Sequence, residues 1–229
     1  MKIKFGAIVV DGRNKIGGHV ASANKYGNYL RTKVTPMNPK TVNQNLIRSR
    51  LTDISQSWRE LTQAQRDAWN NAVTDYKKTD IFGDIKNPSG FTLFQRLNNN
   101  LSIIGATPLT SPPLPQETSS LTSLSVAVKT GVPTVTITFN PPITAVFKAK
   151  LYATPPLSPG KNFVKSEYRL IGVLDSTSSS PFDATALYTA RFGNVGETGQ
   201  KIFFAVQLVT VATGQTGGRI SASCISTAS

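Results

Sequence analysis

The spacing of apolar and polar residues changes along the chain from a strand pattern to a helix pattern and back. The first residues alternate, with apolar positions at Ile3, Phe5, Ala7 and Val9. A period of two predicts a strand, and the glycine-containing turns at residues 11–12 and 17–18 predict a small β-hairpin or meander. A second extended stretch is expected over residues 25–34, where the prolines that follow end it.

From residue 41 the apolar spacing becomes helical. Thr41 with Gln44, and Thr62 with Gln65, have the spacing of a capping box, in which a hydroxyl and an amide side chain satisfy the first free N–H groups of a helix. They predict helices beginning near residues 42 and 63, the second reaching residue 77, and a third is expected over residues 89–101. The apolar positions of these helices are Val42, Leu46, Leu51, Ile54 and Trp58; then Ala68, Trp69, Ala72, Val73 and Tyr76; then Phe91, Phe94, Leu97 and Leu101. Trp58 and Trp69 are expected to anchor the core of a helical hairpin.

Residues 105–120 contain four prolines and few apolar residues, which predicts a semi-rigid linker. Beyond it, short runs with strand character lie at residues 121–128, 133–139, 146–153, 168–174, 202–211 and 219–225. Six or seven short strands separated by turns, in about 110 residues, are typical of an immunoglobulin or fibronectin type III sandwich. A short helix ended by Gly193 is expected over residues 183–192.

The predicted fold class is therefore α+β with two domains. Residues 1–104 are expected to hold a basic hairpin and three helices, residues 105–120 to form the linker, and residues 121–229 to form an Ig-like or fibronectin-III-like β-sandwich.

Composition excludes several functional classes. The longest apolar runs are far shorter than the roughly 20 residues of a membrane-spanning helix, and no signal-peptide core is present. We therefore expect no membrane association. A single cysteine, Cys224, and a single histidine, His19, are too few for an intramolecular disulfide, a zinc site or a cysteine/histidine catalytic pair. No cofactor or metal is expected.

No pattern in the sequence indicates an enzyme. The spacing of Gly12, Gly17 and Gly18 resembles the opening of a phosphate-binding loop, but the loop's lysine and hydroxyl residue are absent. Asp53 and Glu60 lie among basic residues, as on a solvated surface, and not in the crowded setting that shifts catalytic carboxylates. The second predicted helix is too acidic for a helix-turn-helix recognition helix.

The positive charge is concentrated at the N-terminus. The net charge is +13, and the first fifty residues contain ten basic residues and one acidic residue. In the stretch 25–34, alternation would place Tyr29 on the same strand face as the cations, an arrangement that suits phosphates and bases as well as an acidic protein. The residues predicted to contact a partner or nucleic acid are Lys2, Lys4, Arg13, Lys15, Lys25, Tyr29, Arg31 and Lys33.

Three stretches together resemble a group of largely uncharacterised proteins encoded by tailed bacteriophages and prophages. They are VTPMNP at residues 34–39, SQSWRELTQAQRDAWN at residues 55–70, and PLSPGKN at residues 156–162 followed by Tyr168. The second stretch is the most specific. The resemblance implies a virion component with a helical N-terminal part and a β-sandwich, and it brings no catalytic residues.

The basic N-terminus, the predicted linker and the resemblance to phage proteins together lead to one main expectation. The chain is expected to be a non-enzymatic structural component of a phage virion, made in the bacterial cytoplasm. It would be a minor or decoration protein of the head (capsid) or neck (head–tail connector). Its partners would be capsid or neck subunits, in many copies or as a homo-oligomer, docked through the basic N-terminal part. The alternative is a phage nucleic-acid-binding protein that uses the same basic, aromatic face. An envelope-degrading enzyme has no supporting residues.

Overall fold

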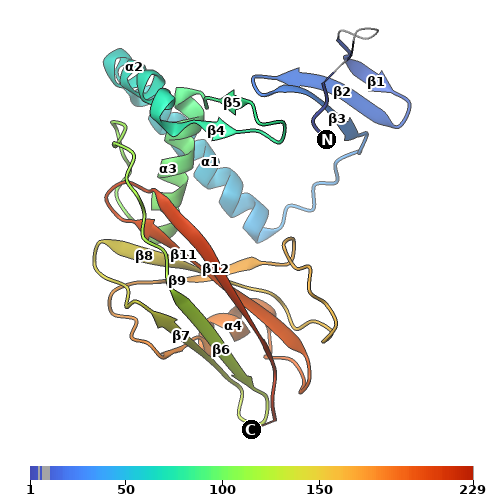
Figure 1. Cartoon of the computed structure of the whole chain (residues 1–229), viewed down its shortest axis with the longest axis vertical. Helices are drawn as coiled ribbons and strands as arrows, with labels where there is room; N and C mark the ends of the chain where they lie inside the picture. Colours follow the sequence, from blue (N-terminus) through green and yellow to red (C-terminus); the bar gives the residue numbers. More distant parts are fainter. Residues whose placement is uncertain (5, 7–10, 229) are drawn as a thin grey trace. The chain divides into compact units, whose positions relative to one another are not determined.

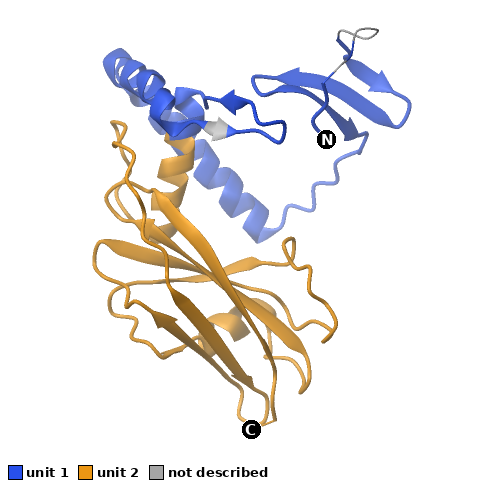
Figure 2. Cartoon of the chain, in the orientation of Figure 1, with its two compact units in different colours: residues 1–93 blue, residues 94–229 orange. Residues whose placement is uncertain are grey.

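A computed structural model describes residues 1–4, 6 and 11–228 of the chain (Figure 1). These residues form a mixed α+β structure with four α-helices, one 3-10 helix and several antiparallel sheets. They divide into two compact units, unit 1 with residues 1–93 and unit 2 with residues 94–229 (Figure 2). The division falls within helix α3 (Gly90–Ile104) and not at the predicted linker 105–120.

Unit 1 begins with a three-stranded antiparallel sheet. Its strands are β1 (Asn14–Ile16), β2 (His19–Asn24) and β3 (Gly27–Thr32), in that order. The turn between β1 and β2 requires Gly17, whose φ is 57°. The N-terminal residues extend the sheet, because Lys2 forms a bridge with Tyr29 and the Leu30 amide donates to the Met1 carbonyl at 2.8 Å. The rest of the predicted first strand, at Phe5, Ala7 and Val9, lies outside the described residues.

Strand β3 is shorter than the extended stretch predicted over residues 25–34. Lys25 and Tyr26 form the turn between β2 and β3, where the Tyr26 amide donates to the Asn24 side chain at 2.9 Å. Lys33 follows the end of β3, although its amide still donates to the Gly18 carbonyl at 2.9 Å. The tight turn at Gly27, with φ of 101°, breaks the strand that alternation alone would continue.

The helical part of unit 1 starts where the capping residues predict. It contains α1 (Val42–Glu60), α2 (Gln63–Asn71), the 3-10 helix η1 (Ala72–Tyr76) and the small hairpin of β4 (Lys78–Thr79) and β5 (Ile85–Lys86). The Thr41 hydroxyl accepts a hydrogen bond from the Gln44 amide, and Thr62 with Gln65 forms a complete capping box. The second helix ends at Asn71, earlier than predicted, because the chain tightens into the 3-10 turn.

Burial on α1 is confined to its second half. Ile54 is buried and the Trp58 ring meets Phe91 edge-on, with ring centroids 5.6 Å apart. On α2, Trp69 is fully buried. By contrast Leu46 and Leu51 are 55% and 46% exposed, and Val42 is more exposed still. The apolar positions listed for α1 from the sequence therefore divide into a buried second half and a first half that extends beyond the packed region of unit 1.

The approach of α2 to the start of α3 depends on a glycine. A Cβ atom at Gly90 would collide with the Asn70 side chain and would lie 3.0 Å from the Trp69 carbonyl carbon. Within unit 2 the rest of α3 has one buried apolar face, on which Phe94, Leu97 and Leu101 are each at most 2% exposed.

Unit 2 contains two larger antiparallel sheets and a short helix. The strands are β6 (Ser123–Lys129), β7 (Thr134–Asn140), β8 (Phe147–Ala153), β9 (Arg169–Leu174), β10 (Phe182–Asp183), β11 (Lys201–Thr210) and β12 (Thr216–Ile225). One sheet has the order β10-β7-β6 and the other β12-β11-β8-β9. Helix α4 (Thr185–Phe192) ends at Gly193, whose φ is 89°.

One hydrophobic cluster joins the two sheets of unit 2. It takes alternate residues from β7, such as Ile137, and from β8 and β11, such as Leu151 and Phe204, and all three are fully buried. The Tyr188 hydroxyl of α4 donates to the Thr154 carbonyl at 3.0 Å within the same region. Alternation thus assigns one face of each sheet to this core and leaves the opposite face of β8, β11 and β12 for other contacts.

The predicted linker has no regular structure but is held against unit 2. Asn98 of α3 receives a hydrogen bond from the Leu109 amide at 2.7 Å and donates one to the Leu109 carbonyl at 3.2 Å. In the same way, the Gln215 side chain donates to the Leu114 carbonyl and accepts a hydrogen bond from the Gln116 amide. Paired side-chain amides give this stretch fixed partners, so it does not act as a free connector.

Candidate partner interface

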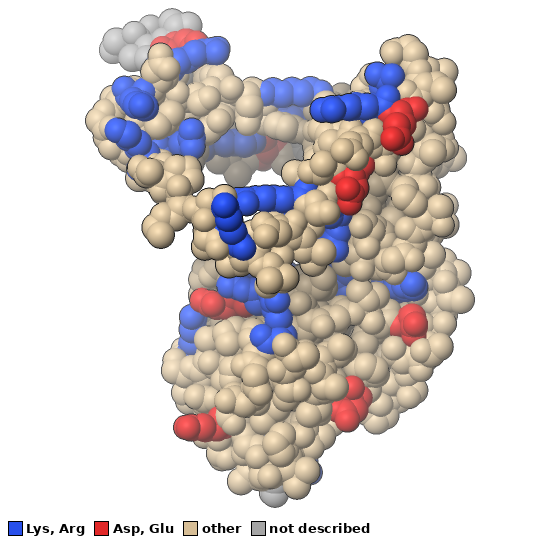
Figure 3. Space-filling model, turned by 180° about the vertical axis from the view of Figure 1, so that it is seen from behind, with Lys and Arg blue, Asp and Glu red and all other residues tan. Residues whose placement is uncertain are grey.

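The residues predicted to contact a partner all lie in or beside the sheet of unit 1. Lys2 and Lys4 belong to the N-terminal segment, and Arg13 precedes β1. Lys15 lies in β1, Lys25 in the β2–β3 turn, Tyr29 and Arg31 in β3, and Lys33 just after it. Lys and Arg side chains gather over this part of the chain on the face that Figure 3 shows.

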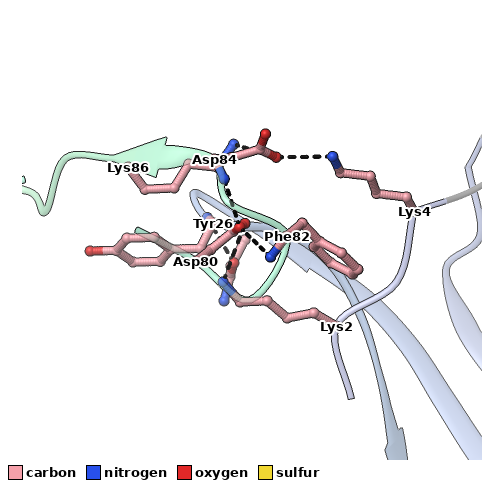
Figure 4. A network of polar contacts seen from close by, with 8 residues as sticks. Lys2, Lys4, Tyr26, Asp80, Phe82, Asp84 and Lys86 are labelled. Carbon is pink, nitrogen blue, oxygen red and sulfur yellow. Dashed lines mark hydrogen bonds and ion pairs between the residues drawn. The ribbon is translucent and has the colours of Figure 1, made fainter. Parts of the chain in front are cut away.

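Part of this charge is used inside unit 1. Lys2 Nζ lies 3.7 Å from Asp80 Oδ2, and Lys4 Nζ lies 3.2 Å from Asp84 Oδ2, so the N-terminal segment is joined to the turn between β4 and β5 (Figure 4). Lys25 Nζ donates to the Pro88 carbonyl at 3.1 Å, and Arg13 pairs with neighbouring Asp11. The Lys2–Asp80 and Lys4–Asp84 pairs line an open pocket of about 320 Å³, together with Tyr26 and Phe82. Four of the eight predicted contact residues therefore already have protein partners.

Asp80 is the central acceptor of this junction. Its side chain is 5% exposed and accepts hydrogen bonds from the Phe82 amide at 2.8 Å and the Asp84 amide at 3.1 Å. Burial on its own would raise the pKa of Asp80. The two amides, helped by the Lys2 and Lys86 ammonium groups, outweigh it and lower the pKa below its usual value. A lowered pKa favours the ionised form in the folded protein. Ionised Asp80 therefore contributes to the free energy of unfolding at neutral pH, and this contribution is lost only as the pH falls through the lowered pKa.

Removing both carboxylates is expected to loosen the N-terminal segment. In Asp80→Asn with Asp84→Asn, the cations lose their partners, so the amides of Ile3 and Leu30 should exchange hydrogen faster. About 0.5 M NaCl should have a similar effect on the wild type, since salt screens ion pairs. Hydrogen exchange followed by mass spectrometry measures both. Asp67→Asn on α2 is the matched control, and unchanged exchange in the double variant would show that the ion pairs do not hold the segment.

The other cations form a row across the sheet. Lys15 pairs with Val20, and Val20 with Arg31, so the three side chains share one face, with Tyr29 two positions further along β3. Lys15, Arg31 and Lys33 are exposed and form no ion pair with any of the described residues. No acidic residue occurs between Asp11 and Asp53. This row is therefore available to an acidic partner.

The first half of α1 adds exposed apolar surface to unit 1, some of it from Ile47, which the sequence analysis did not single out. Ile47 is 63% exposed and Leu51 46% exposed. Their spacing continues through Ile54 and Trp58 at intervals of four, three and four residues, which places all four on one helix face. We call Ile47, Leu51 and the flanking Val42 and Leu46 the α1 stripe. Lys40, Arg48 and Arg50 are its neighbours in sequence, so an apolar surface that also carries acidic residues would fit it.

Unit 2 holds a second cationic cluster that the sequence analysis missed. On the sheet face opposite the core, Lys150 of β8, Gln207 of β11 and Arg219 of β12 lie directly opposite one another. Lys150 is 4% exposed, and its Nζ donates to Asn100 Oδ1 at 2.9 Å. Burial, with a smaller contribution from Arg219, lowers the pKa of Lys150 to about 8. Only strand register brings these residues together, so no local sequence signal identifies them.

The lowered pKa of Lys150 makes the stability of unit 2 depend on pH. Between about pH 8 and the higher pKa of an unfolded lysine, the unfolded chain binds the proton that the folded chain releases. The free energy of unfolding of the wild type should therefore rise over this interval relative to Lys150→Met. Urea unfolding at several pH values gives the difference. If the free energy of unfolding changed with pH in the same way in both proteins, the lowered pKa of Lys150 would be contradicted.

The part of the chain that the structure describes contains no group of three or more His, Cys, Asp or Glu side chains arranged to hold a metal ion. No helix in residues 1–4, 6 and 11–228 is long and apolar enough to cross a membrane.

Comparisons of the chain with models of protein families, with curated proteins and with solved structures find no match.

Proposed function

We propose that this chain is a non-enzymatic structural component of a tailed-phage particle, associated with the head or neck and docked through unit 1. The observation that carries the proposal is the combination, in unit 1, of an acid-free cationic row with an exposed apolar helix stripe. Large exposed apolar patches with a polar rim mark interaction sites. The second half of α1 packs within unit 1 through Ile54 and Trp58, whereas its exposed first half would gain stability by packing its apolar face against a partner.

The chemistry of this surface defines the partner. Two copies of the surface would repel each other, because residues 12–52 contain only basic charges. The partner is therefore another virion subunit that presents acidic residues beside an apolar groove. Multiple copies would add individually weak contacts into stable attachment.

Unit 2 supports the structural part of the proposal. We assign it to the immunoglobulin-like or fibronectin-III-like β-sandwiches, because its two antiparallel sheets share one hydrophobic cluster. Such domains serve as spacers and covers in assemblies and need no chemistry of their own.

Nucleic-acid binding is the second candidate, favoured by Tyr29 beside the row of Lys15 and Arg31. Nonspecific nucleic-acid binding needs several cations that neutralise phosphates together. The engagement of Lys2, Lys4, Arg13 and Lys25 with protein groups reduces that number, which favours docking to protein.

A salt titration separates the two candidates. The full chain is titrated against fluorescent double-stranded DNA over a range of NaCl concentrations. Docking to protein predicts no binding near about 0.15 M salt, whereas each phosphate neutralised adds roughly 0.9 to the log–log salt slope. A slope of about 3 or more, abolished by Lys15→Gln with Arg31→Gln, would overturn the proposal in favour of nucleic acid.

A further inference from the structure

Arg219 in unit 2 is held between two aromatic rings. The guanidinium carbon lies 4.3 Å from the centroid of the Tyr152 ring and 4.2 Å from that of the Tyr168 ring, well inside cation–π distance. Tyr152 comes from β8, and Tyr168 immediately precedes β9. Two rings fix the plane of a guanidinium far better than one.

The strand register makes room for this arrangement. Ala205 of β11 lies directly opposite both Tyr152 of β8 and Ser221 of β12. Since Ala205 has only a methyl side chain on this face, the Arg219 side chain can cross β11 toward the Tyr152 ring. The clamp therefore depends on a small residue at the centre of the sheet, as well as on the tyrosines.

The clamped guanidinium has no acceptor of its own. Among the described residues, no carboxylate lies within ion-pair distance of Arg219, and no hydrogen bond joins its N–H groups to protein. Lys150, on the same face, has only the neutral Asn100 oxygen as its partner. In the described part of the chain, these two cations on one sheet face have no carboxylate as a counter-charge. Arg219 is exposed to solvent, whereas Lys150 is buried.

We propose that Arg219, clamped by Tyr152 and Tyr168, binds an oxyanion, a carboxylate or a phosphate group, on the face of the β12-β11-β8-β9 sheet opposite the core. Arginine presents parallel N–H groups that match two oxygens of such an anion. Both rings lie at cation–π distance from the guanidinium carbon, and no described residue accepts a hydrogen bond from its N–H groups, which are therefore left for the anion. The ordering of a flexible side chain, which usually opposes binding, is already achieved in the free protein. The proposal does not depend on the docking role of unit 1.

The test uses inorganic phosphate and acetate as probes on the full chain. Arginine Nε–Hε and backbone amide resonances are followed by two-dimensional NMR, with ionic strength held constant by replacing NaCl. We expect saturable shifts of the Arg219 Nε–Hε signal and of the Gln207 amide, with a dissociation constant of roughly millimolar for so small a ligand. Saturation by phosphate alone or by acetate alone would identify the class of anion.

Variants separate the clamp from general charge. Arg219→Lys keeps the charge but loses the paired N–H groups and should weaken binding about fivefold or more. Tyr168→Leu keeps Arg219 but releases one side of the clamp and should weaken binding about threefold. Arg191→Gln on α4 removes one charge elsewhere in unit 2 and should leave binding unchanged. Shifts that never saturate, or equal affinities for wild type and Arg219→Lys, would overturn the proposal.

Discussion

Replacing Ile47 and Leu51 together by glutamine is expected to abolish attachment of the chain to phage particles while leaving its fold intact. The two side chains are 63% and 46% exposed in the free chain, so covering them on docking would remove most of that apolar surface from water. At the usual value for apolar burial, the loss is roughly 2–3 kcal/mol, or about 30- to 150-fold in affinity. Particles assembled with the variant should therefore carry less than about a tenth of the normal amount.

Glutamine is chosen because it is a good helix former and carries no charge. Exposed substitutions of this kind change stability by about 0.5 kcal/mol or less, so a loss of attachment would not reflect unfolding. Val132→Gln in unit 2 is the control, since Val132 is also an exposed aliphatic side chain, at 76%, but is far from α1 in sequence. Normal incorporation of the double variant would show that the α1 stripe is not part of the interface.

Trp69→Ala is expected to destabilise unit 1 more than any surface substitution. Trp69 is fully buried where α2 meets the start of α3. Truncating a buried tryptophan leaves a cavity as well as lost apolar burial, and typically costs about 3–5 kcal/mol. Urea unfolding should show the loss, and hydrogen exchange should locate it in α2 and in the second half of α1.

The control for this prediction is Phe163→Ala, which truncates a large side chain that is 78% exposed. It should change stability by about 0.5 kcal/mol or less. If Trp69→Ala were destabilised by less than about 1 kcal/mol, the helices of unit 1 would not be organised around this residue.

Local sequence signals predicted the secondary structure of unit 2 closely. Alternation and turn residues placed the strands near their observed ends, and Gly193 ended α4 as expected. These features depend on neighbouring residues, which a sequence displays directly. The same holds for the capping residues Thr41 and Thr62, which mark the starts of α1 and α2.

Features that depend on distant residues were not predictable. Helical periodicity shows that Leu46 and Ile54 are both apolar positions of α1, but only packing decides that Ile54 is buried and Leu46 is not. Counting charges likewise could not show that Asp80 and Asp84 neutralise Lys2 and Lys4, since about 80 residues of sequence separate each pair. The Arg219 cluster arises from register across three strands and has no local signal.

The most direct test of the proposed virion role is quantitative mass spectrometry of tailed-phage particles purified from cells that produce the chain. The copy number of the chain is compared with that of the major shell protein. If the chain is a structural component, its copy number relative to the shell protein should be the same in every preparation. This ratio should survive high-salt washing, because the apolar contacts of the α1 stripe supplement the ionic ones. Absence of the chain from particles, while it is abundant in the infected cell, would contradict the claim.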